Sequence, residues 1–382
     1  MPFLALSRAT LAAAVITACA IFVHSVSPTT ANASATGQLI RIGPLDPAWS
    51  FATAGPSFAL LYSTKDQRDS VAEGSGALYV PPGLAPPGGW PLVVWAHGTV
   101  GIGDACAPSR QPQPGPVSTY LDQILRSGYA VLAPEYQGLG TGGRFSYYNA
   151  TVEGWSILDA VAAIRSAAVP LSKKWVIIGQ SEGAHAAMSA ASLYGGASSG
   201  PAAGLNGVIA TGLRTNPSNS LRQEFKPTST GSTFQIAVMA YDLASLQDLY
   251  PDRVTPYLSD FGKDYVASAN TECLLELVAR ADGRRPADLV TNPDQPTPTF
   301  AADMDALASY REDHFTADIM IGYGTADITV PPTDTEDYGK TLQQRNPGIH
   351  VTVKKYQDKD HGGAFLASAP DALAFLDTHL PH

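Results

Sequence analysis

The sequence predicts an α/β fold with a mostly parallel, doubly wound sheet and a helical segment inserted between two strands. Three observations predict it. Short apolar or β-branched runs alternate with helical stretches along much of the 382 residues. The inner runs are almost continuously apolar, as strands covered on both faces are. One long interval has helical patterning but no convincing strand, which indicates an insertion.

A leader occupies residues 1–35, before the first predicted element. Arg8 provides a small positive region, an apolar run extends from Ala9 to Val23, and small-residue cleavage motifs end at Ala33 and Ala35. This order is typical of a secretory signal peptide, and the run is too short to predict a membrane span.

Cys19 offers an alternative interpretation of the leader, because Ile16–Cys19 resembles a lipoprotein cleavage motif. The apolar run continues through Val23, where a lipoprotein would have a polar tether, so a simple secretory signal is favoured. We therefore expect a secreted, soluble mature chain without a transmembrane segment.

The fold begins with a predicted antiparallel hairpin at 58–64 and 76–80, followed by a Pro-rich connector at 81–91. Apolar runs then predict strands at 91–96, 130–133, 175–178, 207–211, 319–323 and 350–356. Helical patterning predicts helices at 118–126, 151–167, 183–194 and 364–380.

The interval 213–310 interrupts this alternation. We interpret it as a helical cap or lid, so that the α/β core comprises 36–212 and 311–382. Its predicted helices lie at 235–249, 258–267 and 270–281, before a Pro/Asp/Thr-rich segment at 286–298.

Charge and cysteine content narrow the function classes. A net charge of −10 argues against nucleic acid as a partner. No Cys/His cluster has zinc-like spacing, so neither a metal nor another cofactor is predicted. Once Cys19 leaves with the leader, Cys106 and Cys273 remain, and in an oxidising compartment they predict a disulfide. Two buried free thiols are the alternative.

The segment Lys174–Ala187 carries the strongest chemical signal. An apolar strand breaks into Gly179-Gln180-Ser181-Glu182-Gly183 and continues as an Ala-rich helix. Strand, tight turn and helix together form a nucleophile elbow, which exposes the serine hydroxyl above the sheet. The pattern is short enough to occur by chance, and an ordinary glycine-rich turn is the alternative. The assignment therefore depends on whether the sequence also offers a catalytic base and acid.

The base and the acid are expected on loops that follow strands. His361 lies between the last strand and the last helix, in a Gly-rich loop, and Asp327 follows the strand at 319–323. His185, four residues after Ser181, is expected to be a packed or hydrogen-bonded helix residue. Asp318 precedes its strand and should lie at the wrong end. The predicted catalytic residues are Ser181, Asp327 and His361.

An oxyanion hole requires two backbone N–H groups. Glu182, directly after the serine, should supply one. The loop His97–Gly101 follows an early strand, and the N–H of Thr99 is expected to supply the other, with His97 in a structural role.

In combination these segments resemble the secretory lipase family, the α/β-hydrolases of the Candida antarctica lipase A type. The resemblance rests on five segments: Ala96–Thr99, Leu132–Gly140, Gly179–Gly183, Gly324–Asp327 and the His361 loop. It implies an α/β-hydrolase fold in which a cap covers the site and shapes an acyl tunnel. Asp104–Ser109 resembles the family's cysteine-bearing segment, which supports a Cys106 to Cys273 bridge from core to cap.

These features predict a carboxylic-ester hydrolase with a small-molecule or lipid ester substrate, acylglycerols being the expected class, and transient contact with a lipid surface. Apolar residues of the predicted cap favour an apolar acyl chain, although they could equally form the cap's own core: Phe234, Ile236, Val238, Met239, Leu243 and Leu246. The alternatives are an acyltransferase with the same triad, a prolyl-type serine peptidase, and a non-catalytic binding protein on the same scaffold.

Overall fold

The computed structural model describes residues 35–113, 115–195, 200–215, 226, 231–293 and 298–382. Apart from Ala35, the predicted leader with Cys19 lies outside the described residues, as do 216–225, 227–230 and 294–297 of the predicted cap. Among the described residues, no helix combines the length and the apolar character needed to cross a bilayer.

Three antiparallel strands form one side of the nine-stranded sheet: β1 (Leu39–Pro44), β2 (Ser57–Lys65) and β3 (Val71–Tyr79). The hairpin expected from the sequence is β2 and β3. The sequence did not reveal β1, because this edge strand has no fully buried residue and therefore lacks a run of apolar side chains.

β3 pairs antiparallel with β5. Beyond β5, each strand of the sheet is parallel to its neighbours. The strands of this parallel part, in spatial order, are β5 (Ala130–Pro134), β4 (Trp90–Ala96), β6 (Leu171–Gln180), β7 (Leu205–Thr211), β8 (Asp318–Gly324) and β9 (Val351–Tyr356). The order reverses at β4, which lies between β5 and β6. Such a switch point is where open α/β sheets place their sites.

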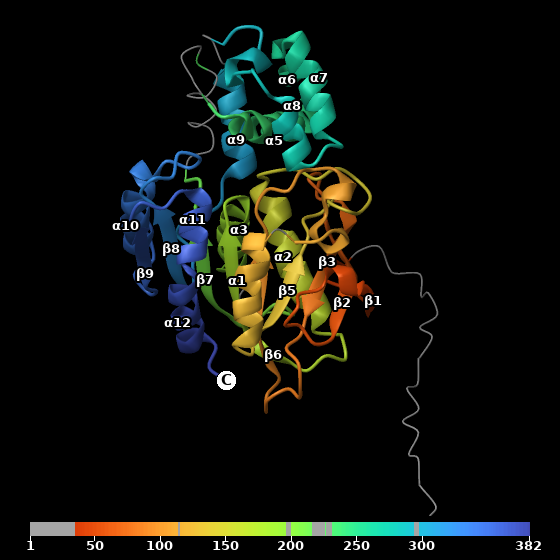
Figure 1. The fold of residues 1–382 in the computed structure, drawn as a ribbon, viewed down its shortest axis with the longest axis vertical. Helices are drawn as coiled ribbons and strands as arrows, with labels where there is room; N and C mark the ends of the chain where they lie inside the picture. The colour runs from red at the N-terminus through yellow and green to blue at the C-terminus, as the bar shows by residue number, and fades with distance from the viewer. Residues whose placement is uncertain (1–34, 114, 196–199, 216–225, 227–230, 294–297) are drawn as a thin grey trace, which may run out of the picture. The chain divides into compact units, whose positions relative to one another are not determined.

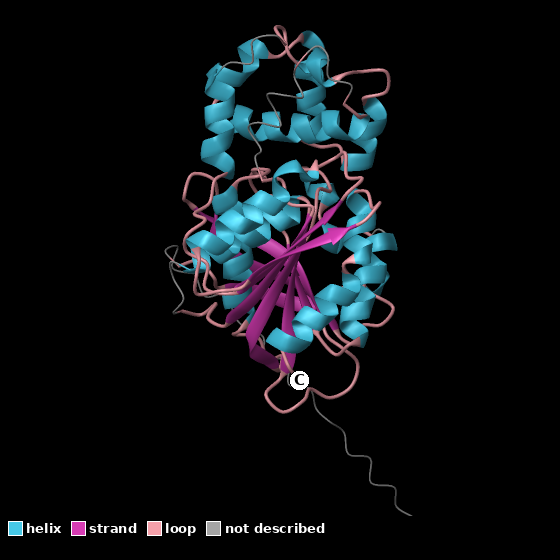
Figure 2. Cartoon of the chain, turned by 90° about the vertical axis from the view of Figure 1, so that its left-hand side faces the viewer, coloured by secondary structure: helices cyan, strands magenta, loops and turns pink. Residues whose placement is uncertain are grey.

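Helices cover both faces of the sheet (Figures 1 and 2). Within β4, Leu92 and Val94 belong to one apolar core, and Val93 and Trp95 belong to the other. The first core includes side chains of α2 (Ala150–Ile164), α3 (Glu182–Gly195) and α10 (Thr335–Arg345). The second includes side chains of α1 (Gly115–Arg126), α11 (His361–Ala367) and α12 (Ala369–His379).

The C-terminal region corrects one prediction. The single helix expected at 364–380 is two helices, α11 and α12, and His361 is the first residue of α11 rather than part of a loop. The Asp360 side chain caps α11 by accepting a 2.7 Å hydrogen bond from the N–H of Gly363. Pro370 stands in the first turn of α12, where its missing N–H is tolerated, and this separates the two helices.

Between β7 and β8 the described chain is helical, and Figure 1 places these helices together beyond one end of the sheet. A capping box of Ser232 and Gln235 starts the first of them. The α-helices are α5 (Thr233–Leu249), α6 (Pro251–Val254), α7 (Asp260–Ala269), α8 (Leu274–Arg280) and α9 (Pro298–Ala308). The helix α9 was not predicted, because Pro-rich sequence precedes it.

A disulfide joins Cys106, on the loop after β4, to Cys273, which precedes α8, with a Cα–Cα distance of 5.4 Å. Beside it, Gly101 forms an isolated β-bridge with Cys273, and the N–H of Leu274 donates to the carbonyl of Val100 at 2.9 Å. The bridge between the two predicted cysteines therefore attaches the helical insertion to the loop after β4.

Replacing both cysteines, as Cys106→Ser/Cys273→Ser, should lower the free energy of unfolding by about 2–5 kcal/mol. The disulfide closes a loop with a sequence separation of 167, so its loss releases a large conformational freedom in the unfolded chain. Equilibrium urea unfolding of the oxidised protein and of the double variant measures the difference. Identical unfolding midpoints and slopes would contradict the prediction.

Candidate active site

Ser181 occupies the sharp turn between β6 and α3. Its φ of +59° lies in the left-handed region, which non-glycine residues rarely adopt. A Cβ at Gly179 would lie 2.0 Å from the Gly183 carbonyl oxygen, and a Cβ at Gly183 would lie 1.9 Å from the Ala96 carbonyl oxygen. Only glycine allows strand and helix to approach this closely, so the turn has the geometry of a nucleophile elbow.

Asp327 and His361 form a hydrogen-bonded pair. The Nδ1–H of His361 donates to Asp327 Oδ2 at 2.7 Å, and the Asp327 side chain is 1% exposed. Asp327 Oδ1 accepts from the N–H groups of Thr329 and Val330, both at 2.9 Å. These bonds hold the Asp327 carboxylate in place. Because Nδ1 of His361 is bonded to that carboxylate, Nε2 is the ring nitrogen that remains available to a reacting group.

The end of β7 brings the serine and the histidine to the same edge of the sheet. The N–H of Ser181 donates to the Thr211 carbonyl at 2.9 Å. At the next residue, Gly212, an added Cβ would lie 2.7 Å from Cε1 of His361. His361 Nε2 has no hydrogen-bond partner among the described residues, so the bond to Ser181 Oγ is not formed in this structure. Such bonds often tighten only when substrate binds.

Gly212→Ala should lower kcat for ester hydrolysis by about 100-fold, the scale of a 1 Å misplacement of a catalytic group. The substitution adds a Cβ against the His361 ring at a residue whose φ is +66°. Gly283→Ala is the matched control, because Gly283 has a similar φ of +70° but no heavy atom within 4 Å of the added Cβ. Steady-state kinetics of both variants measures the effect; equal kcat values would argue against this role of Gly212.

The loop after β4 lies against the elbow. A Cβ at Gly98 would lie 3.6 Å from Ser181 Cβ, so the main chain of this loop passes beside Ser181. The Tyr136 hydroxyl donates to the His97 carbonyl at 2.9 Å, and the Thr99 and Tyr147 hydroxyls are 2.6 Å apart. The loop that carries the expected oxyanion donor is thus held on several sides.

Residues 117–381 match the family described as Secretory lipase. This chain belongs to the secretory lipase family. Lipases are carboxylic-ester hydrolases, so membership assigns the chain to that enzyme class. None of the curated protein sequences compared with the chain matches it.

Two solved structures have a fold similar to that of this chain. Candida antarctica lipase A in its closed state is 20% identical with a TM-score of 0.73, over 91% of this chain and 82% of that one. A rice cell wall degrading esterase from Xanthomonas oryzae is 18% identical, also with a TM-score of 0.73, over 91% of this chain and 98% of that one. At these identities the likeness establishes the α/β-hydrolase fold.

His185 is buried and hydrogen-bonded, as expected for a packed residue of α3. Its Nε2–H donates to the Ala308 carbonyl at 2.8 Å, because a carbonyl can only accept. Burial lowers the pKa of His185 to about 4, so the ring is neutral and Nδ1 accepts. Glu153 lies 2.9 Å from Nδ1, and burial raises its pKa well above the usual range. The proton in the hydrogen bond between His185 Nδ1 and Glu153 therefore resides on Glu153.

Other buried acidic side chains lie near the elbow. Burial raises the pKa of Glu182 well above its usual range. Asp242 on α5 pairs with Arg214, after β7, at 3.0 Å. Sequence reasoning missed these acids, because no local pattern places Glu153 or Asp242 near Glu182.

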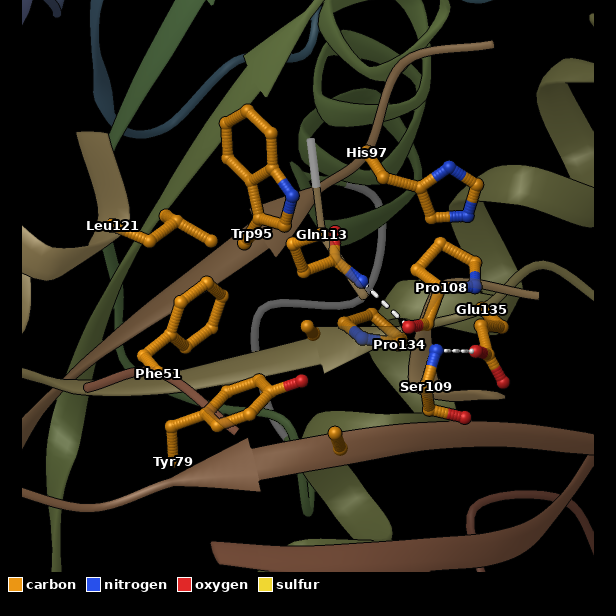
Figure 3. Close-up of a pocket in the computed structure, with 12 residues that line it drawn as sticks. Phe51, Tyr79, Trp95, His97, Pro108, Ser109, Gln113, Leu121, Pro134 and Glu135 are labelled. Atoms are coloured by element: carbon orange, nitrogen blue, oxygen red, sulfur yellow. Dashed lines mark hydrogen bonds between the residues drawn. The ribbon is translucent and has the colours of Figure 1, made fainter. Parts of the chain in front are cut away.

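A separate pocket includes residues at the end of β4 and just after it, Trp95 and His97 (Figure 3). Trp95, His97 and Glu135 are among its lining residues, and the N–H of Ser109 donates to Glu135 Oε1 at 2.6 Å. Neither Ser181 nor His361 lines this pocket. Its polar contacts instead support the segment beside Cys106, so we assign the pocket no part in substrate binding.

Proposed function

We propose that this secretory lipase is exported and hydrolyses apolar acyl esters, with acylglycerols as the substrate class, through an acyl-enzyme on Ser181. The proposal rests on one observation. Ser181 and the Asp327–His361 pair contact two successive residues, Thr211 at the end of β7 and Gly212 directly after it. The leader sequence supports export.

In the first half-reaction, Ser181 Oγ attacks the acyl carbonyl carbon while His361 Nε2 takes the hydroxyl proton. Asp327 holds the ring with its proton on Nδ1 and stabilises the imidazolium that forms. The N–H groups of Thr99 and Glu182 stabilise the oxyanion. His361 then protonates the leaving alcohol. In the second half-reaction water attacks the acyl carbonyl carbon while His361 Nε2 takes its proton. The bond between the acyl carbon and Ser181 Oγ then breaks, Oγ takes the proton back from His361, and the carboxylic acid leaves.

We further propose that the described part of 213–310 acts as a cap over the site. Contacts with the core support this role: the N–H of Tyr147 donates to Ser245 Oγ at 2.7 Å, and the Cys106–Cys273 disulfide joins the insertion to the loop after β4. Ile236, Met239, Leu243 and Leu246 are completely buried. Their apolar character is accounted for by packing within the fold, so the substrate class rests on family membership and the names of the lipase relatives.

Hydrolysis of acyl esters from C2 to C18, in solution and as triacylglycerol emulsions, tests the function. We expect turnover of apolar esters with release of free acid. An alcohol or sugar acceptor included in the assay separates hydrolysis from acyl transfer, and a panel of peptide amides tests for a peptidase. Acyl transfer that dominates in water, or cleavage of amides without cleavage of esters, would overturn the proposal.

A further inference from the structure

We propose that the chain is cleaved between Ala35 and Thr36 and that the new α-ammonium group of Thr36 pairs with the buried carboxylate of Asp159. This inference rests on the proposed export of the chain but not on its ester chemistry. Two independent observations meet here: a cleavage motif in the sequence, Ala33-Ser34-Ala35, and an incompletely bonded carboxyl group in the fold.

Asp159 is a buried acid without a matched cation. It lies on α2 and is 5% exposed, and its Oδ2 has no hydrogen-bond partner among the described residues. The nearby Lys65 already pairs with Asp69 at 2.6 Å. Burial raises the pKa of Asp159 to about 6, and the nearby Thr64, Thr36 and Lys65 moderate the rise. A buried ionised carboxylate is destabilising unless a cation pairs with it.

The main chain next to the cleavage motif is held against this acid. The Gly37 N–H donates to the Ser63 carbonyl at 2.7 Å, and the Gln38 N–H donates to Ser63 Oγ at 2.9 Å. Gly37 has a φ of +72°, and a Cβ there would lie 3.2 Å from Asp159 Oδ1. Glycine at this position therefore lets the backbone approach the carboxyl group.

Thr36 is the residue that cleavage would free. Its side chain lies near enough to Asp159 to influence the pKa of that carboxyl group. Its backbone nitrogen is separated from its hydroxyl oxygen by only two carbon atoms. Rotation of the released terminus can therefore bring the nitrogen to the carboxylate. A cut after Ala33 instead leaves the amine two residues away, on Ser34, where it cannot make this contact without rearranging Thr36.

The step itself is hydrolysis by an export peptidase. The Ala35–Thr36 peptide bond breaks, the hydroxide of water joins the Ala35 carbonyl carbon, and the Thr36 nitrogen takes the remaining water proton. At neutral pH the amine binds one further proton from solvent, because the ordinary pKa of an α-amino group is about 7.7–8.0. Pairing with the carboxylate stabilises the ammonium form and satisfies the acid at the same time.

The intact mass and N-terminal sequence of the exported protein test the cleavage position. We expect Thr36 as the first residue. A first residue of Ser34 would overturn the inference while leaving export intact, whereas an uncut chain beginning at Met1 would overturn both. Neither result bears on ester hydrolysis, which is measured separately.

A double-variant cycle tests the ion pair. The mature chain that begins at Thr36 is compared with the same chain extended by Ala35, each with Asp159 or with Asp159→Asn. We expect the extension to lower the Tm by about 3 °C when Asp159 is present and to have no effect in Asp159→Asn. The control is Asp122→Asn on α1, where a half-buried carboxyl also accepts a hydrogen bond from a threonine N–H, that of Thr53; it should leave the extension effect unchanged.

The reactivity of the α-amino group provides a second test of the ion pair, which can be made even if Asp159→Asn does not fold. The α-amino group of native mature protein is acylated at pH 7 and compared with that of the urea-unfolded protein. We expect acylation at Thr36 to be at least about tenfold slower in the native state, because the paired ammonium carries no free lone pair. Equal reactivity in both states would overturn the ion pair.

Discussion

Ser181→Ala should abolish ester turnover, lowering kcat by about 10⁶-fold, as removal of a serine nucleophile does in enzymes with this triad. In the proposed mechanism the Ser181 hydroxyl forms the acyl-enzyme, so the alanine variant lacks the nucleophile. Kinetics with a short soluble ester measures the loss, and circular dichroism checks that the fold is retained.

Ser189→Ala is the matched control for this experiment. Ser189 lies on the same helix, α3, is fully buried, and donates its hydroxyl only to the helix's own His185 carbonyl at 2.8 Å. We expect the control to keep its activity. Hydrolysis by Ser181→Ala at a rate close to that of the control would remove Ser181 from the mechanism.

Asp327→Asn should lower kcat at neutral pH by about 10⁴-fold, the loss seen when the acid of such a triad becomes an amide. Oδ1 of Asp327 accepts two backbone N–H groups, those of Thr329 and Val330, so the amide oxygen of asparagine must occupy this position. The amide NH₂ then faces His361 Nδ1 and forces that nitrogen to accept. The ring proton moves to Nε2, which can no longer take the proton of Ser181.

Asp318→Asn is the control, since Asp318 starts the same strand and also contacts a histidine, His379, at 3.1 Å. That pair lies at the opposite end of β8, so its loss should leave kcat nearly unchanged. If both asparagine variants lost activity equally, the loss would come from destabilisation of β8 and not from a change in the tautomer of His361.

Local sequence patterns were sufficient to predict the elbow. The glycines, the apolar strand and the Ala-rich helix around Ser181 lie within fourteen consecutive residues, Lys174–Ala187, so short-range sterics define the turn. The pairing of Asp327 with His361 was also predicted, because both residues follow parallel strands whose carboxyl ends share one edge. The helical start at His361 was missed, since the Asp360 cap is followed by two glycines that suggest a loop.

The surroundings of the site could not be predicted in this way. Gly212 matters because β7 carries it to the His361 ring, and the proton on Glu153 depends on its burial against His185. Such contacts join residues far apart in the chain, and their energies depend on burial, which no local pattern encodes. Residue types and short-range backbone preferences thus predicted the reaction chemistry, whereas tertiary packing determined which protonation states and which close approaches support it.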